Sequence, residues 1–109
     1  MNVTILNNQS ITSNGSSSNI DIGGYLYVFV FIYVSAVSGT SPSLNVYLNA
    51  YDEVSGQSVN IASVTGISST GTYYMTTASG LAARYVNVSW TVSGTSPSFT
   101  VTITLKAKW

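Results

Sequence analysis

Few side chains in this sequence could take part in acid–base or metal chemistry. The acids are Asp21, Asp52 and Glu53, and the chain contains no histidine and no cysteine. Because successive side chains of an extended chain point to opposite faces, the adjacent Asp52 and Glu53 point apart. They therefore do not form the pair of facing carboxylates that glycoside hydrolysis requires.

The remaining reactive groups do not complete a catalytic set either. Serines are abundant, but the chain has no histidine to act as a base, and its lysines, Lys106 and Lys108, both lie near the C-terminus. Arg84 leads into a predicted strand and is expected to pair with a carboxylate. Asp21 could join Asp52 or Glu53 in a calcium site built from oxygen ligands, although no loop is dense in such ligands. We therefore expect a protein that is not an enzyme and has no catalytic residues, bound metal or cofactor.

Composition narrows the class of partner. The 109 residues correspond to one domain, and charged residues make up 6%, against roughly 25% in an ordinary soluble domain. The formal net charge is zero, which leaves no basic patch for nucleic acid and little repulsion against self-association. The N-terminal residues have neither the basic nor the apolar region of a signal peptide. The low charge is typical of a protein that is packed into an assembly or displayed outside a cell, yet no export signal is recognised. A virion protein assembled in the host cytoplasm would explain both observations, as would a processed secreted protein.

A seven-residue segment occurs twice, and it indicates how the strands are connected. Val-Ser-Gly-Thr-Ser-Pro-Ser fills residues 37–43 and 92–98, between an apolar run and an alternating one. Each copy is predicted to be a β-hairpin corner, with its glycine at positive φ, its central serine extended before proline, and its proline at a strand start. The offset of 55 residues indicates two related halves. The residues concerned are Gly39, Ser41 and Pro42, and Gly94, Ser96 and Pro97.

The rest of the chain shows strand alternation and no helical period. We predict an all-β antiparallel β-sandwich of six to eight strands, jelly-roll-like or immunoglobulin-like, over residues 25–109. Residues 1–24 are expected to be a Ser/Asn-rich arm with a possible short strand, either mobile or ordered against a neighbouring subunit. Residues 78–82 are expected to be a loop. The predicted core consists of Val30, Ile32, Leu44, Val46, Leu48, Ile61, Val86, Val88, Trp90, Val101 and Ile103.

Residues 25–37 form an apolar run too short for a membrane helix. Its even positions are aliphatic (Leu26, Val28, Val30, Ile32 and Val34), whereas its odd positions up to 33 are aromatic. Both faces of this predicted strand are therefore apolar, although a two-layer sandwich needs only one such face. The aromatic side requires a cover, either the arm or a long loop of the same chain, or a neighbouring subunit. The candidate subunit interface is Tyr25, Tyr27, Phe29, Phe31 and Tyr33.

Other tyrosines are expected on the outside of the sandwich. They could stack on sugars, as in a carbohydrate-binding module, or pack against each other across strands. These residues are Tyr47, Tyr51, Tyr73 or Tyr74, and Tyr85.

The second half of the chain also carries a family resemblance. Thr-Gly-Thr-Tyr-Tyr at 70–74 is followed by Ala-Arg-Tyr-Val-Asn-Val-Ser-Trp-Thr-Val-Ser-Gly-Thr-Ser-Pro-Ser-Phe-Thr at 83–100. These segments resemble small β-sandwich structural proteins of tailed phages and related viruses, and Leu-Asn-Val-Tyr-Leu-Asn-Ala-Tyr-Asp at 44–52 also fits. The resemblance covers roughly residues 37–105. It implies a virion component and supplies no site residues.

These observations lead to one leading function and two alternatives. The leading interpretation is a capsid-associated or decorating subunit that forms homo-oligomers and contacts other virion proteins, without nucleic acid or a membrane span. The second is a subunit of an extracellular filament or surface layer that uses strand donation. The third is a carbohydrate-binding module, in which a glycan would be the partner.

Overall fold

The computed structural model describes residues 1–23, 25, 27–77 and 83–108, so the positions of Leu26 and of the predicted loop at 78–82 lie outside the described residues. Strands account for most of this part of the chain, and it contains no helix. The predicted all-β antiparallel sandwich is confirmed. The strands are β1 (Asn2–Ile11), β2 (Gly15–Ser16), β3 (Ile20–Asp21), β4 (Tyr27–Asp52), β5 (Gln57–Ile67), β6 (Gly71–Thr76) and β7 (Tyr85–Lys108).

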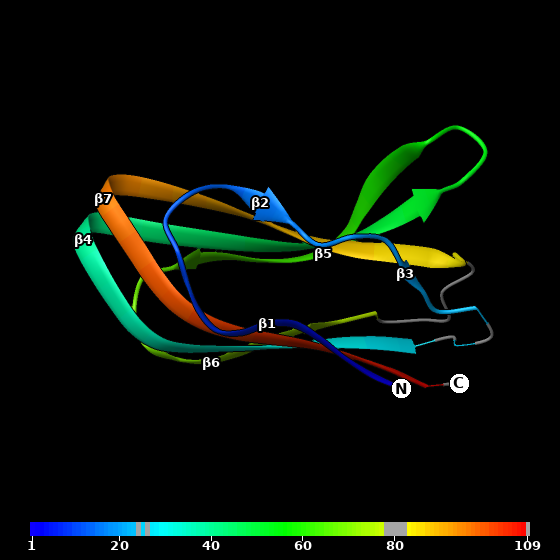
Figure 1. Ribbon diagram of the computed structural model, residues 1–109, viewed down its shortest axis with the longest axis horizontal. Helices are drawn as coiled ribbons and strands as arrows, with labels where there is room; N and C mark the ends of the chain where they lie inside the picture. The colour runs from blue at the N-terminus through cyan, green and yellow to red at the C-terminus, as the bar shows by residue number, and fades with distance from the viewer. Residues whose placement is uncertain (24, 26, 78–82, 109) are drawn as a thin grey trace.

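Two long strands build both layers of the sandwich. β4 and β7 are antiparallel neighbours from the pair Tyr27 and Lys108 to the pair Tyr51 and Tyr85. Both strands bend near their middles, at the left end of Figure 1, so that one continuous sheet folds back over itself. The first half of β4 and the second half of β7 form one layer, in which β6 flanks β4 and β1 flanks β7. The other halves form the second layer, flanked by β5 and by β2 and β3.

The repeated segments lie at these bends, and the predicted hairpin corners are wrong. Each copy of Val-Ser-Gly-Thr-Ser-Pro-Ser continues within its own strand, and the two copies pair with each other across β4 and β7. The register shifts on both sides of Thr40, which marks the bend as a bulged part of the ladder. A bulged strand can pass from one layer to the other without a loop, and β4 and β7 do so at these segments.

The bend also corrects the predicted backbone at the serine–proline pairs. Ser41 and Ser96 each have φ of 49°, in the left-handed region, instead of the extended conformation that usually precedes proline. Pro42 and Pro97 lie inside the bulge and not at strand starts, in a place where the ladder already lacks regular hydrogen bonds. Packing of the two repeat copies against each other at the bend imposes the left-handed conformation on both serines. It overrides the extended conformation that the following proline favours.

The expected relation between the two halves of the chain appears in the strand pairing. Similar segments, Ile-Thr-Ser-Asn-Gly (11–15) and Ile-Ser-Ser-Thr-Gly (67–71), lead from the last residue of β1 to β2 and from the last residue of β5 to β6. Ile11 pairs with Phe99 of β7, and Ile67 pairs with Leu44 of β4, which lies 55 residues earlier. The short strands of each half therefore pair with corresponding positions on a long strand. β5 and β6 flank β4, while β1, β2 and β3 flank β7.

The predicted core is buried between the layers with one exception. Valine, leucine and isoleucine residues from both long strands are fully buried there, and Trp90 is buried as well. The prediction of Ile61 as a core residue is wrong, because Ile61 is 37% exposed. The register passes from Leu48 opposite Ala62 to Asn49 opposite Asn60, so Ile61 is the extra residue of a bulge and does not follow the alternation.

The N-terminal segment is built into the sandwich. β1 pairs along the second half of β7, and β2 and β3 pair along its first half. Leu6, Ile11 and Ile22 are buried in the core, although the surrounding residues are largely Ser, Thr and Asn. Backbone pairing with a neighbouring strand therefore orders a segment whose own apolar content is low.

Candidate functional site: an aromatic sheet face

The outer side of the first layer carries a group of aromatic rings, which we call the aromatic face. It consists of Tyr27, Phe29, Phe31 and Tyr33 from β4 and Tyr74 from β6. The alternation expected from the sequence holds, because Val28, Val30, Ile32 and Val34 on the other side of β4 are fully buried. The first half of β4 is thus apolar on both faces.

Most rings of the aromatic face are exposed to solvent in the single chain. Tyr27 is 41% exposed, Phe31 37%, Tyr33 46% and Tyr74 63%. Phe29 is half-buried and stacks on Tyr74, with ring centroids 5.5 Å apart and planes 8° from parallel. Stacking fixes these two rings and leaves the exposed row on β4 open to a partner.

Two features of the predicted interface differ from the structure. Tyr25 precedes β4 and packs against the core instead of standing in the exposed row. Tyr74 belongs to the aromatic face although it was not placed in the predicted interface, and its stacking on Phe29 is the cross-strand packing given as one of its two alternatives. Its register opposite Phe31 places it beside the row, and the alternation of residues 72–76 was the available signal.

The described part of the N-terminal segment does not cover the aromatic face. β1 lies edge to edge with β7 and extends the sheet in its own plane. The rings have polar cross-strand partners on β7: Tyr33 pairs with Thr102, Phe31 with Thr104 and Phe29 with Lys106. The aromatic face is therefore bordered by polar side chains on one edge, as is common where an apolar patch has a polar rim.

A hollow lies at the end of the aromatic face nearest the two termini. Its volume is about 400 Å³. The lining combines rings and other apolar side chains with two amines, and it consists of Met1, Asn2, Tyr27, Val28, Phe29, Thr76, Lys106, Ala107 and Lys108. Lys106 donates a hydrogen bond of 3.1 Å to the side-chain oxygen of Asn2. The hollow is therefore apolar inside and positively charged at its margin.

The outer side of the second layer is polar by comparison. Asn49 donates hydrogen bonds of 3.0 Å to Asn87 and to Ser89, and Asn45 donates one of 3.0 Å to Thr91. These bonds connect β4 to β7 across the strands and satisfy the amides of the two asparagines. Such a surface has less need of a partner than the aromatic face.

The other tyrosines considered for sugar stacking, three in the second layer and Tyr73 in β6, are engaged within the chain. Tyr51 and Tyr85 are cross-strand partners, and their rings meet edge to face at 6.4 Å. Arg84 lies 5.2 Å from the ring centroid of Tyr85. Tyr47 is half-buried, and Tyr73 donates a hydrogen bond to the carbonyl of Ser69. This arrangement corresponds to cross-strand packing and not to an open platform for a sugar ring.

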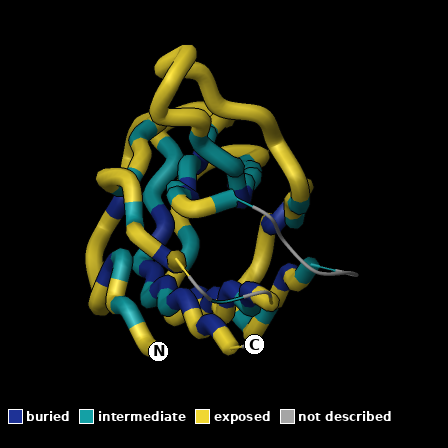
Figure 2. Tube along the Cα trace, turned by 90° about the vertical axis from the view of Figure 1, so that its right-hand side faces the viewer, coloured by how far each residue is buried: buried dark blue, intermediate teal, exposed yellow. Residues whose placement is uncertain are grey.

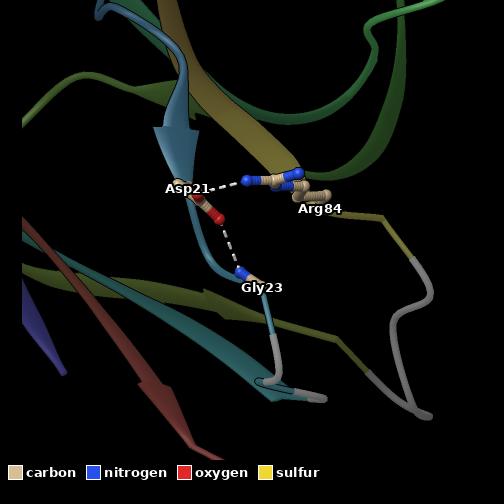
Figure 3. A network of polar contacts seen from close by, with 3 residues as sticks. All are labelled: Asp21, Gly23 and Arg84. Carbon is tan, nitrogen blue, oxygen red and sulfur yellow. Dashed lines mark hydrogen bonds and ion pairs between the residues drawn. The ribbon is translucent and has the colours of Figure 1, made fainter.

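The charged residues at the end of the second layer form local contacts. Figure 3 shows Arg84 beside Asp21, with a nitrogen–oxygen distance of 3.3 Å, which agrees with the pairing expected from the sequence. The other oxygen of Asp21 accepts a hydrogen bond of 2.8 Å from the backbone N–H of Gly23. This N–H, followed by the Arg84 guanidinium, lowers the pKa of Asp21. The hydrogen bond to the Asp21 carboxylate in turn raises the pKa of Arg84. Among the described residues, no three acids lie close enough to hold a metal ion.

Asp52 acts in a turn. Its carboxylate accepts a hydrogen bond of 2.7 Å from the hydroxyl of Ser55 and two from the backbone N–H groups of Val54 and Ser55. These bonds, the hydroxyl first, lower the pKa of Asp52 below its usual value of 3.8. Together with Glu53, Arg84 and neighbouring residues, Asp52 lines an open hollow of about 440 Å³. In the described part of the chain no polar side chain is buried, so nothing in this hollow resembles a desolvated catalytic group.

Acid is expected to destabilise the protein through these two carboxylates. Both have a folded-state pKa below 3.8, so their contribution is fully present above that pH and is lost as the pH falls through the folded values. Because both groups are exposed, the effect is small. Asp21→Asn combined with Asp52→Asn should lower the urea midpoint at pH 7 and flatten its decline between pH 5 and 2. An unchanged pH profile for the double variant would contradict this.

No protein-family model matches this chain, and no curated protein does. Among solved structures, the crystal structure of SPBc2 prophage-derived protein YomS is similar over 96% of this chain and 90% of that one. The TM-score is 0.53 and the sequence identity is 18%. The two proteins therefore share a fold, and one structural neighbour of this chain is prophage-derived. The described residues include no helix long and apolar enough to cross a membrane.

Proposed function

We propose that this chain is a non-enzymatic structural protein of a phage particle, a capsid-associated or decorating subunit that assembles through its aromatic face. The observation that carries the proposal is the exposed row of rings on a fully paired strand. A large aromatic side chain buries on the order of 150–250 Å² in all, and four rings of the aromatic face are still 37% to 63% exposed, so the face offers a few hundred Å² to an interface. The prophage origin of a protein with the same fold supports the phage context.

Charge supports association as well. The chain has six charged side chains and a net charge of zero, so copies repel each other weakly. The aromatic face alone falls short of the roughly 1,200 Å² of a stable interface, and neighbouring surfaces must contribute. Contacts along the edges of the same layer supply that area when subunits pack side by side on a particle.

Removing two rings from the aromatic face tests the proposal. Phe29→Ser combined with Phe31→Ser is expected to abolish self-association while the far-ultraviolet circular dichroism stays that of a β-protein. Sedimentation velocity over a range of concentrations measures the assembly of both proteins. The matched control is Tyr51→Ser with Tyr85→Ser, which removes two rings from the other layer and should leave assembly intact. A wild-type chain that remains monomeric at high concentration would overturn the proposal.

A further inference from the structure

The β4–β5 hairpin extends beyond the sandwich and has a preorganised tip. Figure 1 shows it as the green arm at the upper right, and in Figure 2 it is the exposed loop at the top. The backbone N–H of Gly56 donates a hydrogen bond of 2.9 Å to the carbonyl of Asp52, and the Asp52 carboxylate accepts hydrogen bonds from the N–H groups of Val54 and Ser55. The tip is thus fixed while Val54, at 91%, remains almost fully exposed. An apolar side chain on a fixed, protruding tip is suited to insertion into a partner.

The charges of the molecule are divided between this tip and the hollow of the aromatic face. The ion pair of Arg84 and Asp21 uses one charge of each sign. The other acids, Asp52 and Glu53, lie at the hairpin tip, and the other basic side chains, Lys106 and Lys108, line the hollow. The hairpin belongs to the second layer and points away from the layer that holds the hollow, so the tip and the hollow of one copy do not meet.

We propose that the hairpin tip of one copy docks into the hollow of the next copy. Val54 would enter between Tyr27 and Phe29, and Glu53 would face the amines of Lys106 and Lys108. A hollow of about 400 Å³ has the size of a small ligand site and can accept such a tip. This inference rests on the proposed function, because it names the part of the neighbouring subunit that covers one end of the aromatic face.

The contact joins two different surfaces, so it is head-to-tail. A head-to-tail contact leaves one tip and one hollow free at the ends of every chain of copies, and assembly continues until a ring closes or a filament forms. It differs in this respect from face-to-face packing of two aromatic faces, which stops at a dimer. Attraction between the charges also predicts that added salt weakens the assembly.

Two single-sided variants test the inference by mixing. Val54→Asp disables the tip and keeps the hollow, whereas Lys106→Glu with Lys108→Glu disables the hollow and keeps the tip. Each variant alone is expected to need at least about tenfold higher concentration to assemble. An equimolar mixture should form a one-to-one heterodimer that grows no further, because one intact tip meets one intact hollow. Val59→Asp, on the same hairpin away from the tip, is the control and should assemble like the wild type.

The outcomes separate this inference from the proposed function. If Val54→Asp assembles like the wild type while the Phe29 and Phe31 double variant does not, the hairpin contact is wrong and the aromatic face remains the interface. If the mixture contains only monomers, the head-to-tail contact is wrong. A monomeric wild type would instead overturn self-association itself.

Discussion

Gly39→Ala is expected to lower the free energy of unfolding by roughly 2–5 kcal/mol. Gly39 has φ of 106°, a conformation that a side chain strains. A Cβ atom there would lie 2.6 Å from the carbonyl oxygen of Ser96 and 2.9 Å from the Cα of Pro97. Both contacts are with backbone, so relief requires the two bends to separate.

Gly94 occupies the equivalent place in the other copy of the repeat. Its φ is 121°, and a Cβ atom would lie 2.8 Å from the carbonyl oxygen of Ser41. The two sites share one contact region, so the double variant should lose less than the sum of the single losses.

The matched control for these substitutions is Gly66→Ala. Gly66 also has positive φ, at 71°, but no atom lies within 4 Å of the Cβ that alanine would add. Its loss should be limited to backbone strain of about 1–2 kcal/mol. Urea unfolding followed by circular dichroism measures all of these variants. Equal losses at Gly39 and Gly66 would show that crowding between the bends contributes nothing.

Trp90→Ala is expected to cost roughly 3–5 kcal/mol. Trp90 is buried, lies opposite Val46 of β4 and Gly15 of β2, and packs so closely on β2 that a Cβ on Gly15 would be 2.8 Å from the indole. Removing the indole leaves a cavity between the main sheet and the N-terminal segment. The urea midpoint and slope give the loss. Trp90→Phe keeps a ring at the site and should lose less, whereas a loss below about 1 kcal/mol for alanine would place Trp90 outside the core.

Alternation predicted much of this fold because most strands keep their register. Residues 44–48 and 86–90 place every second side chain in the core, as expected, and the two apolar faces of β4 were evident from its sequence. The prediction for Ile61 failed because a bulge adds one residue to β5. Alternation in the sequence does not indicate where such a register shift falls.

The bends and the N-terminal segment could not be predicted from local sequence. Gly, Ser and Pro favour a hairpin turn, and only the second copy lying alongside makes the same residues a bend in a long strand. The apolar residues in 2–11 are interrupted by Asn, Gln, Ser and Thr, and the order of this segment depends on an edge of β7 that is far away in sequence. Tyr74 joined the aromatic face for the same reason, since its neighbours on β4 are set by tertiary pairing.

The pairing of β7 has a consequence for how the protein is made. β7 emerges from the ribosome after every strand it contacts, and β1, β2 and β3 have β7 as their sheet neighbour. During synthesis, β4 can pair with β5 and β6, but its buried row lacks the opposing strand that completes each layer. The nascent chain therefore carries an apolar, half-finished sheet until residues 85–108 are available. Pairing over such sequence distances is intrinsically slow.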